Sequence, residues 1–541
     1  MKLLSFLRRE SRASLRRLAL LAAVSGLANV LILVVINLSV QRAVEEAHSF
    51  THLLEFLLVT GIYIVSQRYL LVETPTEIDR ILHRIRVRIA DKIRSCELEP
   101  LEAIGRSQIY ACLSRETQTI SLAAVVMVVG LQSGVVIFFA ALYVAWLSVS
   151  ALVVFAVAGA VAATIYRRRS EGLRRDFLEA MERENKVLDT LTHVLDGFVE
   201  IKMNPRRSDR LLEHLGSVSE SASALRLDAK AQFAKLFILG QAILYSLVAA
   251  MVFVVPRLSE TYDDVIVQAA TAMLFLIGPV AFLVSSIQVF ANTDAAIAKL
   301  EALEAELDAA IRRRAEGPEV QIAFRDIRTE GVVFHYHHTK SERPFTLGPL
   351  DLTLTSGETV FIVGGNGSGK STFLRLLTAL YDPDQGRIRI NGKPLTEENL
   401  QAYRNLFSVI FSDFHLFDRL YGLKGVEPER VAALLEQMEL AHKTSYRDGA
   451  FSTLDLSSGQ RKRLAYVVSR LEDRPIYVFD EWAAGQDPEF RKKFYNELLP
   501  QLKQRGKTIV AVTHDDRYWS CADRVLKMEE GRFVDPGELT P

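Results

Sequence analysis

The stretch from Ile120 to Tyr166 contains no charged residue, and it constrains the fold more than any other feature of the chain. A helix that crosses a membrane needs about 20 apolar residues, so this stretch can hold two spans joined by a tight turn near Leu147–Ser150. A soluble core could not easily use so long a run, because no face of it suits water. The first half of the chain is therefore predicted to be a membrane domain.

The same count of apolar residues predicts six membrane helices in this half of the chain. The apolar run that follows the basic amino terminus is longer than the roughly 7–15 residues of a signal-peptide core, so an uncleaved first span is expected. The expected spans are 17–40, 52–72, 120–144, 148–167, 233–256 and 265–291.

Basic residues are distributed unevenly around these spans. Arginines are frequent at the amino terminus and around 73–119 and 167–232, whereas the short loops on the other side carry Glu45, Glu46, Glu260, Asp263 and Asp264. Because lysine and arginine favour the cytoplasmic side, both termini are predicted to be cytoplasmic. That compartment is reducing, so no disulfide is expected between Cys96, Cys112 and Cys521.

Two long segments between the spans are expected to extend the membrane helices into the cytoplasm. Isoleucines recur at helical spacing through 76–95, with charged residues between them. Each segment ends in a break, at Cys96–Gly105 and at Asp196–Pro205, where a short transverse helix would dock on a domain below. An ordinary helix–turn–helix is the alternative. Gly317-Pro318 indicates the boundary between a membrane domain at 1–310 and a second domain at 320–541.

Strands and helices alternate in the second domain, which is typical of an α/β fold. The apolar segment ETVFIV leads into GGNGSGKST and then into the apolar segment FLRLLTAL, which matches G-x-x-x-x-G-K-[ST] between a strand and a helix. Backbone N–H groups of such a loop surround phosphate oxygens, Lys370 reaches the β- and γ-phosphates, and Ser371 binds Mg²⁺. The predicted nucleotide-binding residues are Gly364, Gly365, Asn366, Gly367, Ser368, Gly369, Lys370, Ser371 and Thr372.

Two further apolar segments end in residues that suit phosphate hydrolysis. RPIYVFDEW ends in paired carboxylates, of which Asp480 is expected to hold Mg²⁺, directly or through water, and Glu481 to act as general base on the attacking water. KTIVAVTHDD presents His514, which is predicted to sense the γ-phosphate; a surface histidine is the alternative. A third site opens a helix with Ser457, Ser458, Gly459 and Gln460, a start that suits an anion held by another subunit.

In this order, GGNGSGKST, LSSGQ, VFDE and TH resemble the nucleotide-binding domain of an ATP-binding cassette transporter over about 320–541. The preceding spans resemble an exporter-type half-transporter. The resemblance implies a multidomain fold, with an all-α six-helix transmembrane domain followed by an α/β P-loop nucleotide-binding domain. It also implies ATP and Mg²⁺ as cofactors and a homodimer in which each ATP lies between one P-loop and the partner copy's signature segment.

The resemblance assigns two more residues. Tyr336 matches the aromatic residue that stacks on adenine, and Asp487 matches the aspartate that crosses the dimer interface. The neighbouring His335, His337 and His338 are not expected to bind a metal, because no cysteine or acid completes a site.

The stretch IFSDFHLF occupies the place where this superfamily has a glutamine that touches Mg²⁺, and here Ser412 stands in the glutamine's position. The FSDFH run, and the stretch GFVEIKMN, resemble the branch that exports cyclic peptides, including siderophore precursors (pyoverdine type), lipopeptide toxins (syringomycin type) and microcins. We hypothesise that Ser412 and a bound water replace the glutamine and that Asp413 orders the loop. The apolar residues of the stretch are expected to pack a coupling surface beneath Asp196–Pro205; they are Phe411, Phe414, Leu416 and Phe417.

The sequence therefore predicts an ATP-driven homodimeric exporter in a bacterial inner membrane, surrounded by lipid, that moves a cyclic or siderophore-type peptide from cytoplasm to periplasm. A lipid flippase or multidrug exporter is the main alternative, and a siderophore importer is another. A soluble or nucleic-acid-associated ATPase is disfavoured by the six spans and by the lack of a basic face. Polar residues inside the spans either line a cargo cavity or bond one helix to another; they are Asn29, Asn37, Gln67, Arg68, Gln132, Gln241, Tyr245 and Gln268.

Overall fold

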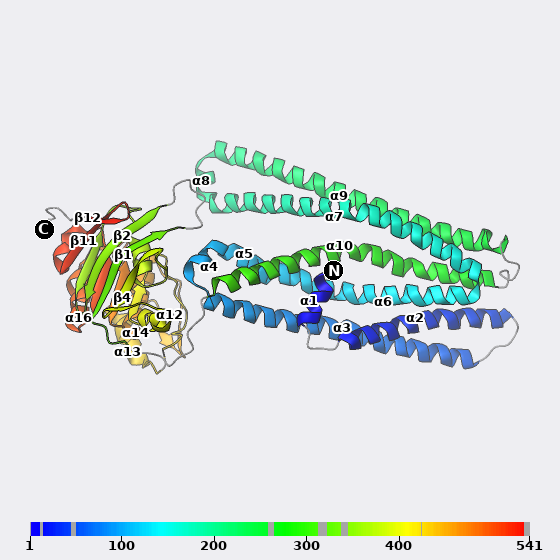
Figure 1. Ribbon diagram of the computed structural model, residues 1–541, viewed down its shortest axis with the longest axis horizontal. Helices are drawn as coiled ribbons and strands as arrows, with labels where there is room; N and C mark the ends of the chain where they lie inside the picture. Colours follow the sequence, from blue (N-terminus) through cyan, green and yellow to red (C-terminus); the bar gives the residue numbers. More distant parts are fainter. Residues whose placement is uncertain are drawn as a thin grey trace. The chain divides into compact units, whose positions relative to one another are not determined.

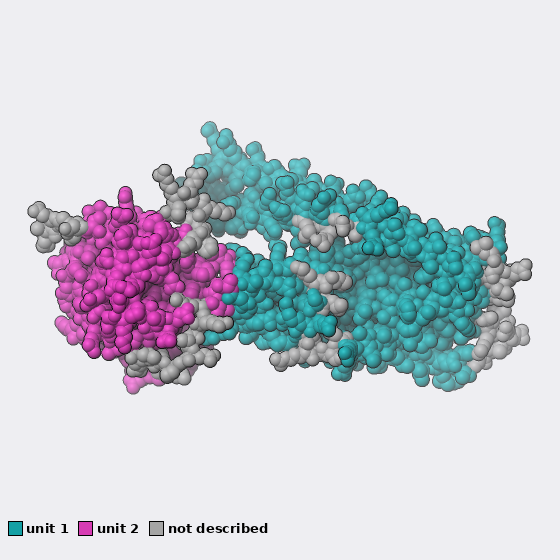
Figure 2. All heavy atoms as spheres, viewed as in Figure 1, with its two compact units in different colours: residues 1–94, 106–308 teal, residues 95–105, 309–541 magenta. Residues whose placement is uncertain are grey.

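The computed structural model describes residues 2–10, 15–44, 50–257, 265–311, 322–336, 345–423 and 425–534. The chain forms two compact units, of which unit 1 comprises residues 1–94 and 106–308 and unit 2 comprises residues 95–105 and 309–541 (Figure 2). The segment Ser95–Gly105, which lies inside the expected membrane domain, therefore belongs to unit 2 by its contacts. The acidic loop residues, Gly317-Pro318, His337 and His338 lie outside the described residues.

Unit 1 is built from long helices, which Figure 1 shows lying alongside one another. Six helices in the described residues are long and apolar enough to cross a membrane, by length and composition. All six expected spans lie on these helices, although the fifth runs beyond the end of α9 into a short 3₁₀ turn. The bounds are α1 Lys2–Glu10, α2 Leu15–Val44, α3 Phe50–Ser95, α5 Arg106–Ala111, α6 Thr117–Leu147, α7 Val149–Asp196, α8 Phe198–Met203, α9 Pro205–Phe253 and α10 Ile266–Ala310.

The turn expected near Leu147–Ser150 is present. Ser148 has an extended backbone between α6 and α7, and its Oγ accepts a hydrogen bond from the backbone N–H of Ala151 at 3.4 Å. Asn204 caps α9 in the same way, with Pro205 in the first turn. Such caps satisfy N–H groups that have no partner inside the helix, so each long helix begins at a defined residue. A short helix is found at each expected tip, namely α4 (Leu98–Ile104) and α8.

The interior of unit 1 is packed with small and medium apolar side chains. Ala140 and Val144 of α6, Met251 of α9, and Ala272 and Leu276 of α10 belong to one buried apolar cluster. Small residues allow membrane helices to approach closely. Many large apolar side chains of α3 face outward instead, including Leu57, Leu58 and Val65, as expected for a surface that faces lipid.

Unit 2 contains a six-stranded sheet in the order β12-β11-β3-β10-β9-β6 and a four-stranded sheet in the order β2-β1-β4-β5. In the larger sheet the strands β11, β3, β10, β9 and β6 are parallel and β12 is an antiparallel edge. The strand bounds are β1 Asp326–His335, β2 Thr346–Thr355, β3 Thr359–Val363, β4 Gln385–Ile390, β5 Lys393–Pro394, β6 Phe407–Ile410, β9 Ile476–Asp480, β10 Thr508–Val512, β11 Arg524–Glu529 and β12 Arg532–Val534. A short hairpin of β7 (Tyr446–Arg447) and β8 (Ala450–Phe451) completes the strands.

The central parallel strands are buried on both faces. Val360 and Ile362 of β3 belong to one apolar cluster, whereas Phe361 between them belongs to the other. Successive side chains of a strand point to opposite faces, so a parallel strand covered on both sides is apolar throughout. The helices that supply these clusters are α11 Lys370–Leu377, α12 Glu397–Arg404, α13 Pro428–Gln437, α14 Ser458–Glu472, α15 Pro488–Lys493 and α16 Leu499–Gln504.

The parallel order brings separate segments of the chain to one place. The carboxyl ends of β3, β10, β9 and β6 lie at the same edge of the sheet, and the loop that follows each strand begins there. In open parallel sheets this edge is where ligands bind.

Candidate functional site

The loop between β3 and α11 is shaped by glycines that no other residue could replace without strain. Gly364 has φ 149°, and a Cβ there would lie 2.1 Å from the carbonyl oxygen of Met528. Gly369, with φ 103°, is the residue before the first turn of α11. A loop with this backbone turns its N–H groups toward the start of a helix, which is an arrangement that binds phosphate.

Lys370 lies inside this loop. Its side chain is about 5% exposed, and its Nζ donates hydrogen bonds to the carbonyl oxygens of Gly364 (3.0 Å) and Gly365 (2.8 Å). Burial lowers the pKa of this ammonium, although the nearby carboxylates of Glu481 and Asp480 act in the opposite direction. A buried cation bonded only to carbonyl oxygens is well placed to bind an anion.

Asp480, the last residue of β9, has a buried carboxylate of the kind that binds divalent cations. Its Oδ1 is buried and has no hydrogen-bond partner among the described residues, while its Oδ2 accepts a hydrogen bond from the backbone N–H of Ser412 at 3.4 Å. Burial raises the pKa of Asp480, and hydrogen bonds from Ser371 and Ser412 partly offset that rise. A Mg²⁺ ion held by Asp480, Ser371 and phosphate oxygens fits this donor set, because Mg²⁺ typically takes one or two carboxylates and the substrate's phosphates.

Glu481 and His514 meet at the same edge of the sheet. Nε2 of His514, which follows β10, lies 3.1 Å from Oε1 of Glu481. Glu481 has a left-handed backbone with φ 50°, an unusual conformation for a residue with a side chain. Both residues line a cavity of about 240 Å³ with Gly485, Arg491 and Asp515. A carboxylate beside a small polar cavity can accept a proton from water.

The start of α14 has a capping box that explains two of its predicted residues. Oγ of Ser457 accepts from the N–H of Gln460 at 3.3 Å, and Oε1 of Gln460 accepts from the N–H of Ser457 at 3.1 Å. Ser458 is exposed, and the carbonyl oxygen of Gly459 accepts from Gln486 at 3.0 Å. Ser457 and Gln460 therefore shape the helix start, whereas the exposed Ser458 is available to another molecule.

Two basic residues after the signature segment have roles that the sequence analysis missed. Nζ of Lys462 donates to the carbonyl oxygens of Glu481 and Ala484, each at 2.7 Å, and burial lowers the pKa of this ammonium. Arg463 lies over the ring of Phe490 at 3.6 Å and pairs with Asp487. These contacts hold the turn after β9 against α14. The basic run that follows LSSGQ was the available signal.

Asp487 and Tyr336 are also held in place by neighbouring groups. Oδ1 of Asp487 accepts from the N–H of Phe490 at 2.8 Å, which caps α15; this hydrogen bond, followed by the charge of Arg463, lowers the pKa of Asp487. The Tyr336 hydroxyl lies 2.8 Å from Oγ1 of Thr372 in α11. The Tyr336 ring thus lies beside the first turn of the P-loop helix, which suits contact with a bound base.

The loop after β6 differs in part from expectation. Oδ2 of Asp413 pairs with Arg375 of α11 at 3.2 Å, which supports its predicted role in ordering the loop. Leu416 is only about 6% exposed and packs in the interior of unit 2, so its side chain supports the loop from inside. Phe417 is about 59% exposed. In this irregular loop, buried and exposed side chains do not alternate as they do in a strand. The sequence alone therefore did not show which of them are buried.

The segment that contains α4 docks on the rest of unit 2 through charged pairs. Glu97 accepts from Arg404 at 2.5 Å, and Glu102 accepts from the hydroxyl of Tyr381 at 2.6 Å. Arg375 lies 3.6 Å from Glu102 as well as contacting Asp413. One arginine of the P-loop helix therefore connects α4 with the loop that begins at Ser412.

Several polar residues of the spans bond helix to helix. Nδ2 of Asn37 in α2 donates to Tyr143 of α6 (3.2 Å) and to the carbonyl oxygen of Gln268 in α10 (3.3 Å). Ser25 of α2 joins Gln67 of α3 and Gln132 of α6 at 3.1 and 3.2 Å. For these residues the structure favours the alternative of helix bonding over cargo contact.

Comparison with known proteins agrees with this geometry. Residues 347–484 match the family model described as ABC transporter. The ATP-binding protein SyrD of Pseudomonas syringae pv. syringae is 34% identical over 477 residues, which cover 84% of this chain and 82% of that protein. An ATP-dependent lipid A-core flippase of Alkalilimnicola ehrlichii is 33% identical over 226 residues, 39% of this chain and 37% of the flippase.

A solved structure has the same fold. A bacterial Atm1-family ABC exporter with ATP bound superposes with a TM-score of 0.77 at 18% identity, and the match covers 97% of this chain and 96% of that chain.

Proposed function

Because the chain belongs to the ABC transporter family, whose members couple ATP hydrolysis to transport, we propose that it is an exporter of a cyclic or siderophore-type peptide, working as a homodimer in a bacterial inner membrane. The observation that carries this proposal is the extent of the similarity to SyrD, which is 34% identical over 84% of the chain, whereas lipid A-core flippases match 39% of it at 33% identity or 55% of it at 27% identity. Ser412 stands where the superfamily usually has a glutamine, and this replacement also supports the branch that exports cyclic peptides.

In the proposed mechanism, N–H groups of the P-loop and Lys370 bind the phosphates of ATP, and Tyr336 supports the adenine. Asp480 and Ser371 would hold Mg²⁺, which when bound supplies charge neutralisation at the phosphates. Glu481 accepts the proton of the attacking water. His514, whose Nε2 lies 3.1 Å from that carboxylate, senses the γ-phosphate and orients Glu481.

We propose that the site is completed by the partner copy. Ser458 is exposed at the start of α14, where backbone N–H groups and the helix dipole favour an anion. ATP that contacts both copies binds the closed dimer more tightly than the open one, and this difference in affinity drives closure. Closure would move the membrane helices, and hydrolysis would reverse it.

A cross-linking experiment tests the dimer. Two single-cysteine copies, Asn366→Cys and Ser458→Cys, are made in a background that lacks Cys96, Cys112 and Cys521. A disulfide should form only when the two are mixed and ATP is present. Cross-linking that is indifferent to ATP, or a strictly monomeric protein during turnover, would contradict the shared site.

A metabolite comparison tests the cargo. Cells that produce the wild-type chain and cells that produce Lys370→Ala are compared by mass spectrometry of the cell extract and the medium. A peptide retained inside the variant cells and depleted from their medium supports peptide export. A change confined to membrane lipids would instead favour a flippase, and sensitivity to unrelated apolar compounds would favour a multidrug exporter.

A further inference from the structure

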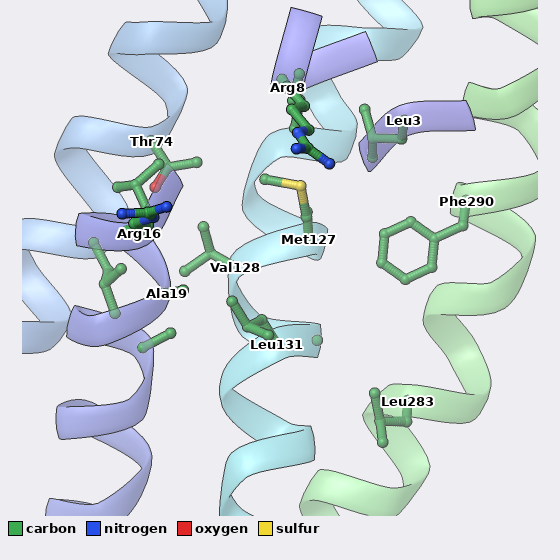
Figure 3. A pocket seen from close by; sticks show the side chains of 15 residues that line it. Leu3, Arg8, Arg16, Ala19, Thr74, Met127, Val128, Leu131, Leu283 and Phe290 are labelled. Carbon is green, nitrogen blue, oxygen red and sulfur yellow. The ribbon is translucent and has the colours of Figure 1, made fainter. Parts of the chain in front are cut away.

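Unit 1 holds a cavity of about 600 Å³ beside α1 and the first two turns of α2. Residues of five helices line it: α1, α2, α3, α6 and α10. Figure 3 shows their side chains around the cavity. Its walls are almost wholly apolar, with Leu7, Ala22, Leu70, Leu131 and Phe290 among them. An apolar cavity of this size is suited to an apolar ligand rather than to water.

Two arginines are the charged members of the lining. Figure 3 shows Arg8 reaching toward Met127 and the Arg16 guanidinium beside Thr74. Among the described residues neither has an ion pair, whereas the neighbouring Arg9 pairs with Glu301 at 3.1 Å and Arg17 lies over the ring of Tyr69 at 5.3 Å. Two guanidinium groups without a carboxylate partner, at the wall of an apolar cavity, match a ligand with an anionic head and an apolar tail.

The position of the cavity indicates where such a ligand would come from. α1 is amphipathic, because Leu3, Phe6 and Leu7 are buried while Arg8 is exposed, and the N–H of Leu3 donates to Asp294 of α10 at 3.0 Å. The first span begins at Arg16. An amphipathic helix of this kind, next to the end of a span, lies at the boundary between lipid headgroups and acyl chains.

We propose that this cavity is a binding site for an anionic phospholipid of the cytoplasmic leaflet. One acyl chain occupies the apolar space, and the phosphate lies between Arg8 and Arg16. A phospholipid supplies both the tail and the charge, and the leaflet on the cytoplasmic side carries the anionic lipids. A free phosphate would satisfy the arginines and leave the apolar walls without a partner.

The test measures lipid retained by the purified full chain in detergent, by native mass spectrometry. The lipids compared are phosphatidylglycerol and phosphatidylcholine with identical chains, and inorganic phosphate is added as a competitor. We expect phosphatidylglycerol to be retained about tenfold more strongly than phosphatidylcholine. Both lipids offer a phosphate, but the choline cation of phosphatidylcholine repels the two guanidinium groups, and a difference of roughly 1.4 kcal/mol corresponds to a tenfold change in affinity. The double variant Arg8→Gln, Arg16→Gln should lose this preference, whereas Arg17→Gln, which removes a charge from the same helix outside the cavity, should keep it.

A second variant tests the space for the acyl chain and leaves Arg8 and Arg16 unchanged. A Cβ at Gly130 would lie 3.5 Å from Phe290 and 4.0 Å from Leu283, which are ordinary contact distances, and all three residues line the cavity. The side chain of Gly130→Leu is therefore expected to take up part of the cavity. It should lower phosphatidylglycerol retention while the thermal unfolding midpoint stays near that of the wild type. Unchanged retention in both the double variant and Gly130→Leu would overturn the proposal. So would release of the lipid by inorganic phosphate, or a cross-link from Ala19→Cys to a helix of the second copy.

Discussion

Polar side chains are arranged differently in the two units of this chain. In unit 2 they gather at one edge of a parallel sheet, where Lys370, Asp480 and His514 follow three different strands. In unit 1 they are spread along the spans, where Asn37 and Gln132 bond one helix to another. Oδ1 of Asp480, at the sheet edge, is buried and has no hydrogen-bond partner in the part of the chain that the structure describes.

The difference shows where a ligand can be inferred from one chain. A buried polar atom without a partner raises the free energy of the folded state unless something binds it. The sheet edge contains such an atom and so indicates a ligand, whereas the bonded amides of the spans are already satisfied and indicate none. In unit 1, Oγ1 of Thr74 is also buried without a hydrogen-bond partner among the described residues, and it lines the large apolar cavity together with Arg8 and Arg16.

The sharpest test of the sheet edge is Glu481→Gln. Loss of the general base should lower ATP hydrolysis by about 10²-fold or more, because general base catalysis contributes a factor of that order. Nucleotide binding should be retained, since the P-loop contacts are unchanged. Phosphate release and binding of a fluorescent ATP analogue are measured together, with Glu489→Gln of α15 as a control that should hydrolyse ATP normally. Full activity in Glu481→Gln would remove Glu481 from the reaction.

The contact of α4 with the rest of unit 2 can be tested by measuring ATP binding and export separately in the same variant. Glu97→Gln removes the ion pair with Arg404, whose side chains are about 19% and 22% exposed. A partly buried pair of this kind is worth roughly 1–2 kcal/mol, so export in the metabolite comparison should fall about fivefold or more while ATP affinity is unchanged. Arg404→Gln should have a similar effect, and the double variant should cost less than the sum of the two. Additive losses would show that the two residues act independently.

Some residues of this site could be predicted from the sequence because a local pattern marks them. Others could not, because their partners lie far away along the chain. Lys370, Asp480, Glu481 and His514 were predictable because each follows an apolar strand, and parallel strands bring their carboxyl ends together. Lys462 was missed because the carbonyl oxygens it binds belong to Glu481 and Ala484, in a turn whose path no local pattern specifies. The six membrane helices of unit 1 were predictable from apolar length, whereas its cavity depends on how α1, α6 and α10 pack, which their periodicity does not determine.

Substitution of Ser412 is expected to have a smaller effect on ATP hydrolysis, and it separates the role of the side chain from that of the backbone N–H. Its N–H bond to Asp480 survives replacement by alanine, so Ser412→Ala should lower hydrolysis only several-fold and raise the Mg²⁺ concentration needed for half-maximal rate. Ser412→Gln is the matched variant, because it restores the side chain found in most of the family. Titration of the ATPase with Mg²⁺ compares the three. Identical curves for Ser412→Ala and the wild type would refute the proposed role of the hydroxyl.

The smallest expected effect is on stability without nucleotide, and it depends on Oδ1 of Asp480, which is buried without a hydrogen-bond partner among the described residues. Burial raises the pKa of Asp480, so its ionisation opposes folding. The folded state binds the proton more tightly than the unfolded state, and the carboxyl's contribution to stability is therefore lost as pH rises from about 4 through the raised value. Asp480→Asn cannot ionise, so its unfolding midpoint should match the wild type near pH 4 and exceed it by a few degrees near pH 7. Addition of Mg²⁺ and ATP should reverse the order, because only the carboxylate gains the metal. If the variant were less stable than the wild type at pH 7 without nucleotide, the carboxylate would be satisfied by the chain itself, and the distinction between the sheet edge and the bonded spans would fail.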